Sequence, residues 1–140
     1  MSHDVLYDGT ILLDRTVARD LDAIREGQSE LAEWRLRGHV TVHVAGALAE
    51  EFNRDDLDAI GRRAVRLNIG TLIAVGSRAR VLHLAAEHEG SWDGESLPVA
   101  DIDSAYDELT RLRGDGVVVL VTGSHDVVLS ELVDRLKEAA

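Results

Sequence analysis

The chain alternates short apolar runs with longer segments in which apolar residues recur every three or four positions. Residues 71–75 and 117–121 are continuous apolar runs, and each is closely followed by a Gly-Ser pair. Such runs are typical of strands buried on both faces of a parallel sheet. Residues 39–44 alternate polar with apolar side chains, which predicts a further strand.

Helical periodicity fills the segments between the strands. The expected helices cover residues 18–36, 54–67, 78–88, 103–112 and 126–137. Asn53 is a suitable N-cap for the second helix, and Asp103 or Ser104 for the fourth. The last helix is expected to follow its strand directly, with Ser124 or Asp126 as its cap.

The two ends of the expected sheet differ from its middle. Residues 5–7 and 10–14 flank Asp8-Gly9, a strong signal for a hairpin, and Pro98 confines residues 97–99 to a short or edge strand. Because strands alternate with helices elsewhere, right-handed parallel crossovers are expected. The prediction is therefore an α/β fold: a three-layer Rossmann-like domain with a mainly parallel sheet and an antiparallel N-terminal hairpin. Residues 1–140 are expected to form a single domain.

Charge and composition narrow the function classes. Asp and Glu number 26 against 15 Lys and Arg, a formal charge of −11, which argues against binding to nucleic acid or to anionic membranes. The absence of cysteine excludes disulfides and thiolate chemistry. The first residues do not resemble a leader, and no apolar run approaches the roughly 20 residues of a membrane span. We therefore expect a cytoplasmic protein.

The candidate chemistry lies where strands end. Parallel strands present their carboxyl ends at one edge of the sheet, and a Gly-Ser turn before a helix is expected to leave backbone N–H groups available to a ligand there. His125 is suited to donate a hydrogen bond to an anion or carboxylate. The candidate ligand-binding residues are Asp14, Gly46, Gly76, Ser77, Gly123, Ser124 and His125.

Other constellations favour structural roles. His39 and His43 lie on one side of a strand but too far apart to hold one metal ion, so no metal site is predicted. Ser124 and His125 are sequence neighbours, a poor geometry for a nucleophile and its base, so no catalytic residue is predicted. The acidic residues of segment 50–58 favour a helix start and a solvated face. Trp34 is expected to pack at the domain edge, whereas Trp92 is a candidate for an exposed partner contact.

Four segments carry a resemblance to a known family. They are DGTILLD (8–14), LNIGTLIAVG (67–76), VADIDSA (99–105) and VLVTGS (119–124). In this order they resemble the C-terminal domain of the Mur ligases, and within them the MurF type, which adds D-alanyl-D-alanine to the muramoyl tripeptide. The likeness covers nearly all of the chain. It implies a nucleotide-ribose contact for Asp14, the position that matches the opening aspartate of the family domain.

The chain also departs from the family pattern. Residues 15–20 keep only the alanine of the family's Asn-Ala-Asn-Pro segment, and residues 45–49 lack the aspartate of its Gly-Asp-Met turn. Thr122 and His125 replace the two cations of its Lys-Gly-Ser-Arg turn. No phosphate-binding Gly-x-x-x-x-Gly-Lys-Ser/Thr segment is present, because in the family that element belongs to the central domain.

These observations lead to three hypotheses. The first is a diverged, stand-alone Mur-ligase C-terminal-like module that is non-catalytic alone and binds a small ligand (nucleotide, peptide or amino acid) or a protein partner. The resemblance implies a link to peptidoglycan precursor synthesis. The second is one component of a split ATP-dependent amide ligase, with ATP and Mg required only together with the partner. The third is a structural homo-oligomer that uses the hairpin of residues 5–14 as an open sheet edge.

Overall fold

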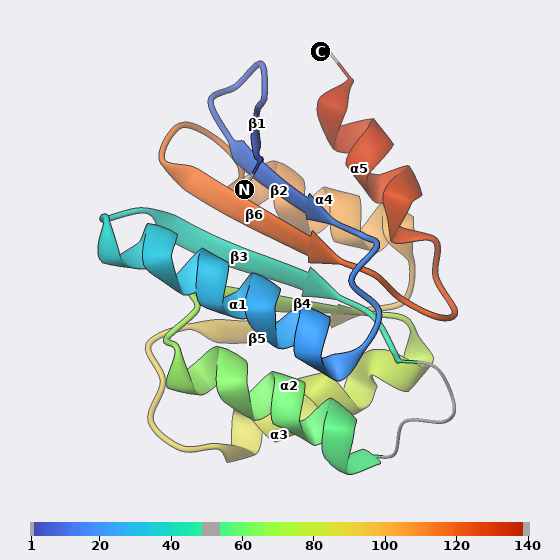
Figure 1. Ribbon diagram of the computed structural model, residues 1–140. Helices are drawn as coiled ribbons and strands as arrows, with labels where there is room; N and C mark the ends of the chain where they lie inside the picture. Colours follow the sequence, from blue (N-terminus) through green and yellow to red (C-terminus); the bar gives the residue numbers. More distant parts are fainter. Residues whose placement is uncertain (1, 49–53, 139–140) are drawn as a thin grey trace.

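A computed structural model describes residues 2–48 and 54–138, and Figure 1 shows a single sheet with helices on both faces. The strands are β1 (Asp4–Val5), β2 (Ile11–Arg15), β3 (Val40–Ala45), β4 (Thr71–Val75), β5 (Glu95–Val99) and β6 (Val117–Thr122). The helices are α1 (Leu21–Leu36), α2 (Arg54–Arg66), the 3-10 turn η1 (Ser77–Ala79), α3 (Arg80–His88), α4 (Ile102–Leu112) and α5 (Leu129–Lys137).

The sheet has the order β1-β2-β6-β3-β4-β5. Only the β1–β2 pair is antiparallel, with Val5 opposite Ile11, and the other pairs are parallel. The strand that contains Pro98 lies at the edge, where a missing backbone N–H costs no ladder bond. The predicted three-layer α/β fold with its N-terminal hairpin is confirmed.

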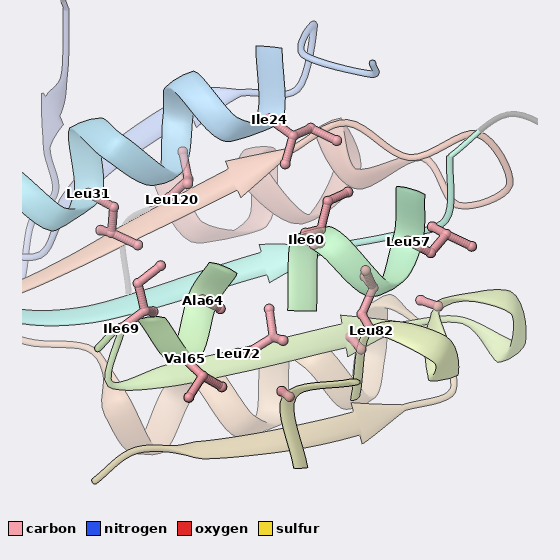
Figure 2. Close-up of a cluster of buried hydrophobic side chains, with 14 of the residues drawn as sticks. Ile24, Leu31, Leu57, Ile60, Ala64, Val65, Ile69, Leu72, Leu82 and Leu120 are labelled. Carbon is pink, nitrogen blue, oxygen red and sulfur yellow. The ribbon is translucent and has the colours of Figure 1, made fainter. Parts of the chain in front are cut away.

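Two apolar cores hold the layers together. On one face of the sheet, α1, α2 and α3 bury side chains such as Ile24, Ile60 and Leu82 against the strands, and Figure 2 shows this cluster. On the other face, α4 and α5 bury Leu109 and Leu132 against the alternate residues of the same strands. Burial of strands on both faces explains why their sequences are continuously apolar.

An ion pair fastens the N-terminal hairpin to the C-terminal part of the chain. The Arg113 guanidinium, with 7% of its side chain exposed, donates from Nε to Asp8 Oδ2 (2.5 Å) and from Nη2 to Leu136 O (2.9 Å). Burial alone would raise the pKa of Asp8, but hydrogen bonds from Thr10 and Arg113 outweigh it and hold the pKa below its ordinary value. The hairpin is thus tied to the last helix.

Several predicted helix boundaries were wrong. Helix α1 begins at Leu21, three residues later than expected, because Asp20 caps it by accepting from Ala23 N. Asp101, not Asp103 or Ser104, caps α4. Helix α5 begins only at Leu129, so residues 123–128 form a loop and neither expected cap occupies its N-cap position. The cap expected at Asn53 lies outside the described residues.

The two tryptophans both pack. Trp34 lies against the first core and makes edge contacts with the rings of His3 and His39, as expected. The expectation of an exposed contact at Trp92 was wrong, because its indole is partly buried against the same core and Nε1 donates to Ile69 O at 2.9 Å. The described helices include none that is long and apolar enough to cross a membrane.

Candidate functional site

The candidate residues lie along the carboxyl edge of the sheet, but the strand order spreads them over four strands. Asp14 is on β2, Gly123–His125 follow β6, Gly46 follows β3, and Gly76 and Ser77 follow β4. Because β6 and β3 separate β2 from β4, the aspartate and the Gly76-Ser77 turn lie at different parts of this edge. The edge divides into two halves with different surroundings.

The half above β6 and β3, which we call the sealed half, is filled by the chain itself. Gly123 N donates to Ala18 O and His125 N donates to Ala47 O, both at 2.8 Å. These two N–H groups were expected to be available to a ligand, and they are not. The loops before α1 and after β3 fold over the strand ends and take up the donors, as buried backbone groups require.

Close packing continues at Gly46 in the sealed half. A Cβ built on Gly46 would lie 2.2 Å from Ser124 Oγ, so the two residues share one space. Ser124 is buried, and its Oγ donates to Asp126 Oδ1 (2.9 Å) and accepts from Val127 N (3.3 Å). Gly46 and Ser124 therefore organise the loop of residues 123–128 from inside.

The remaining hollow at the sealed half is small. It has a volume of about 120 Å³ and is lined by Thr16, Arg19 and the segment 123–130 without Asp126. His125 lines this hollow and is exposed. Asp14 Oδ1 accepts hydrogen bonds from Thr16 N (3.1 Å) and Thr16 Oγ1 (2.8 Å). The Asp14 carboxylate thus stabilises the turn of residues 14–16. A hollow of this size falls below the range of ordinary ligand pockets.

The half above β4 and β5, which we call the open half, is different. A hollow of about 410 Å³ is lined by Gly76, Ser77, Arg80 and residues 98–100. It adjoins at Ala100 a groove of about 700 Å³ between the start of α4 and the loop and first turns of α5. Asp126 and Val127 reach this groove and also lie within 4 Å of a Cβ built on Gly76. Ligand-sized space is therefore found here.

The open half combines a cation with carboxylates. Arg80 lines the smaller hollow. The groove is lined by the ion pair of Arg135 and Asp103 and by the further carboxylates Asp101, Asp126, Glu131 and Asp134. The pKa of Asp101 is held below its ordinary value because its carboxylate accepts from Ser104 N at 2.9 Å. Asp101 is thus ionised at neutral pH. A carboxylate suits an ammonium or amide donor, and the guanidinium of Arg80 suits a carboxylate or phosphate.

The described residues contain no cluster of side chains that could hold a metal ion. His43 is fully buried, and burial lowers its pKa to about 3, so it stays neutral at physiological pH. Its Nε2 lies 3.0 Å from Thr122 Oγ1 and its Nδ1 lies 3.4 Å from Gln28 Nε2. Sequence reasoning missed this buried polar network, although a glutamine within the apolar stripe of a helix was a visible signal.

A second polar network was also missed. His83 Nδ1 lies 2.8 Å from Ser96 Oγ, and its Nε2 lies 3.0 Å from Glu87 Oε1. This contact joins α3 to β5 and holds the edge strand. Helical spacing pairs residues 83 and 87, but only the fold could bring in Ser96.

Comparisons with known proteins agree with this architecture. No family model matches the chain. The chain is 36% identical over 148 residues to a UDP-N-acetylmuramoyl-tripeptide--D-alanyl-D-alanine ligase of Mycobacterium leprae, an alignment that covers 92% of this chain and 28% of that ligase. The chain therefore spans little more than a quarter of the length of this relative.

Solved structures show the same fold. The MurF ligase from Thermotoga maritima in complex with ADP has a TM-score of 0.71 at 16% identity, covering 97% of this chain and 30% of that one. A MurF from Acinetobacter baumannii has a TM-score of 0.73 at 16% identity, covering 93% and 28%.

The sequence similarity to MurF-type ligases thus extends over nearly the whole of this chain. Its fold is that of a domain found in MurF ligases, as the resemblance implied.

Proposed function

We propose that this chain binds a small ligand of a MurF-type reaction at the open half of its carboxyl edge, and that it supports ligation only together with a separate ATP-binding segment. The observation that carries the proposal is the contrast along one sheet edge. Strand ends above β6 and β3 are closed by the chain's own loops, whereas those above β4 and β5 border ligand-sized space.

The chemistry of the open half supports a D-alanyl peptide or a nucleotide. A dipeptide carries an ammonium and a carboxylate, which match the carboxylate-lined groove and Arg80 respectively. A nucleotide is suggested by the ADP named for the Thermotoga maritima ligase and by the family role implied for Asp14. Because Asp14 lies across the edge from Arg80, a nucleotide that used both would have to extend over the sealed half.

The proposal assigns no bond-making step to this chain. Activation of a carboxylate by ATP requires cations positioned around the transferred phosphoryl group. The sequence has no phosphate-binding loop that would place them. In this view ATP and Mg belong to the other segment, and the candidate residues position a substrate against it.

Reconstitution tests the proposal. The Mycobacterium leprae ligase, shortened by the region that this chain matches, would be mixed with this chain, UDP-muramoyl tripeptide, D-alanyl-D-alanine and ATP. We expect product only in the mixture, and less of it with Arg80→Gln than with the matched control Arg111→Gln on α4. Product from this chain alone, or an inactive mixture of two folded components, would contradict the proposal.

A second candidate is self-association through the sheet edge at β1. Val5 on this edge strand is 67% exposed, and Tyr7 in the following turn is 56% exposed. The strand has one free side. Light scattering of the wild type and of Val5→Lys would test it. A concentration-dependent dimer that the lysine abolishes would support it, and a monomer at all concentrations would exclude it.

A further inference from the structure

A group of arginines lines a further hollow, separate from those at the carboxyl edge of the sheet. Arg25 of α1 and Arg62, Arg63 and Arg66 of α2 line a hollow of about 280 Å³, together with Ala59 and Leu67. None of the carboxyl-edge candidates lines it. Four arginines thus line one hollow in a chain whose formal charge is −11.

Three of these four arginines form no ion pair with a carboxylate among the described residues, although the chain is acidic. Arg66 pairs with Glu89 at 2.8 Å, but the ion pairs of the described residues include none for Arg25, Arg62 or Arg63. Acidic residues outnumber basic ones by 26 to 15, so carboxylates are plentiful elsewhere on the chain. Three of the four arginines that line the pocket therefore have no ion-pair partner among the described residues.

Arg63 has one donor that makes a hydrogen bond and another that is not satisfied. Its Nη2 donates to Ser29 Oγ at 2.6 Å, which fixes the side chain between the two helices. Its Nε is buried and has no acceptor within residues 2–48 and 54–138. An unsatisfied buried donor on a charged group is costly, and an anion in the pocket would offer acceptor oxygens after a small rotation of the guanidinium.

The helix dipole explains part of this arrangement. Arg63 and Arg66 lie in the last turn of α2, where positive charge is favourable. The dipole does not account for Arg25, which comes from the second turn of another helix, nor for the unsatisfied Nε. A bound anion would account both for the position of Arg25 and for the unsatisfied Nε of Arg63.

The two helices that carry the pocket residues are joined by tightly packed core side chains. Ile24, Ile60 and Ala64 lie in the packed core between α1 and α2 and have no exposed surface (Figure 2). Side chains anchored on such packing keep their relative positions, which favours binding of a ligand with a defined shape.

We infer that this arginine pocket binds a small phosphate-bearing anion of about diphosphate size. Guanidinium groups present paired donors that match phosphate oxygens, and several of them can share one multiply charged group. The pocket volume limits the ligand to one or two phosphate groups. A nucleic acid strand is disfavoured by the acidic remainder of the surface.

Calorimetric titration with sodium diphosphate, at about 20 mM and about 150 mM salt, tests the inference. We expect saturable binding that weakens with salt, and a loss of affinity of about tenfold or more in Arg63→Gln and in Arg25→Gln. The matched control is Arg111→Gln, which removes the same charge from a side chain that is 72% exposed on α4. It should bind as the wild type does.

Four results would overturn the inference: no saturable binding by the wild type, equal weakening in Arg111→Gln, unchanged binding in both pocket variants, or binding of an acidic peptide without binding of diphosphate. Urea unfolding of each variant ensures that only folded protein is compared. Arg25→Gln keeps the test decisive if Arg63→Gln does not fold, because Arg25 is exposed. Arg80→Gln at the open half should leave diphosphate binding unchanged, which separates this site from the proposed function.

Discussion

The two halves of the carboxyl edge use similar sequence for different purposes. Both contain a strand that ends in Gly-Ser, at residues 76–77 and 123–124. At the sealed half the serine is buried, while at the open half Ser77 is exposed beside a hollow. After β6, loops from β2 and β3 accept hydrogen bonds from the turn and bury its serine. After β4, Gly76 N donates to Val99 O of the neighbouring strand, and Ser77 begins η1 at the surface. A strand-end Gly-Ser pair thus identifies a site only when nothing else in the chain fills it.

Changing Gly46 to alanine should give the largest effect. The new Cβ would lie 2.2 Å from Ser124 Oγ, so the loop must move, and overpacking of this kind costs about 3 kcal/mol of unfolding free energy. Urea denaturation would measure it. The double variant Gly46→Ala, Ser124→Gly should recover more than half of the loss, and the absence of any recovery would show that the two residues do not share one space.

His43 lies buried on β3, a strand of the sealed half, and should make the unfolding free energy depend on pH. Its pKa is about 3 in the folded chain against 6.5 when exposed, so below pH 6.5 the unfolded state binds the extra proton and stability falls. The expected loss is about 2 kcal/mol between pH 6.5 and 5, from about 1.4 kcal/mol per unit.

The variant His43→Leu isolates this contribution. Gln28 Nε2 also donates to Ile60 O, and Thr122 Oγ1 also reaches Val44 O, so both neighbours keep a partner. As pH falls across this range, the unfolding free energy of the wild type should decrease relative to that of His43→Leu. Parallel curves would mean that His43 does not titrate as its burial requires.

Removing the Ser124 hydroxyl should cost less. Ser124→Ala loses the bonds to Asp126 Oδ1 and Val127 N, which together contribute about 1 to 2 kcal/mol. Hydrogen exchange should accelerate at residues 126–128 with little change in the strands. An effect confined to ligand binding, without faster exchange, would instead assign Ser124 to the site.

The smallest effect on stability is expected at the open half. Ser77→Ala and Arg80→Gln change exposed side chains and should alter the unfolding free energy by no more than about 0.5 kcal/mol. Their effect should appear in binding of D-alanyl-D-alanine, measured by calorimetry. A large loss of stability without a change in binding would reverse the roles given to the two halves.

Much of the fold could be predicted because apolar periodicity is a local property. The runs at 71–75 and 117–121 became β4 and β6, and Asp8-Gly9 formed the turn of the hairpin. Helix ends were less predictable, because Asp20 and Asp101 act as caps through single side-chain contacts that neighbouring residues were equally suited to make.

The site was harder to predict than the fold because closure of a loop is a long-range event. Nothing near Gly123 indicates that Ala18 O will take its N–H, and nothing near His125 points to Ala47 O. The arginine pocket likewise requires Arg25 and Arg63, which are far apart in sequence and meet only when α1 packs beside α2. Residue types can nominate a strand end, but only tertiary packing shows whether it is free.

The central claim is that ligands meet this chain at the open half, and amide chemical shifts test it most directly. Spectra would be recorded while D-alanyl-D-alanine or ADP is added to isotopically labelled protein. The account predicts shifts that grow saturably at Gly76, Ser77, Asp126 and Val127 and leave Gly46 and Gly123 in place. Shifts centred on Gly46 and Gly123, or no shift with either compound, would contradict it.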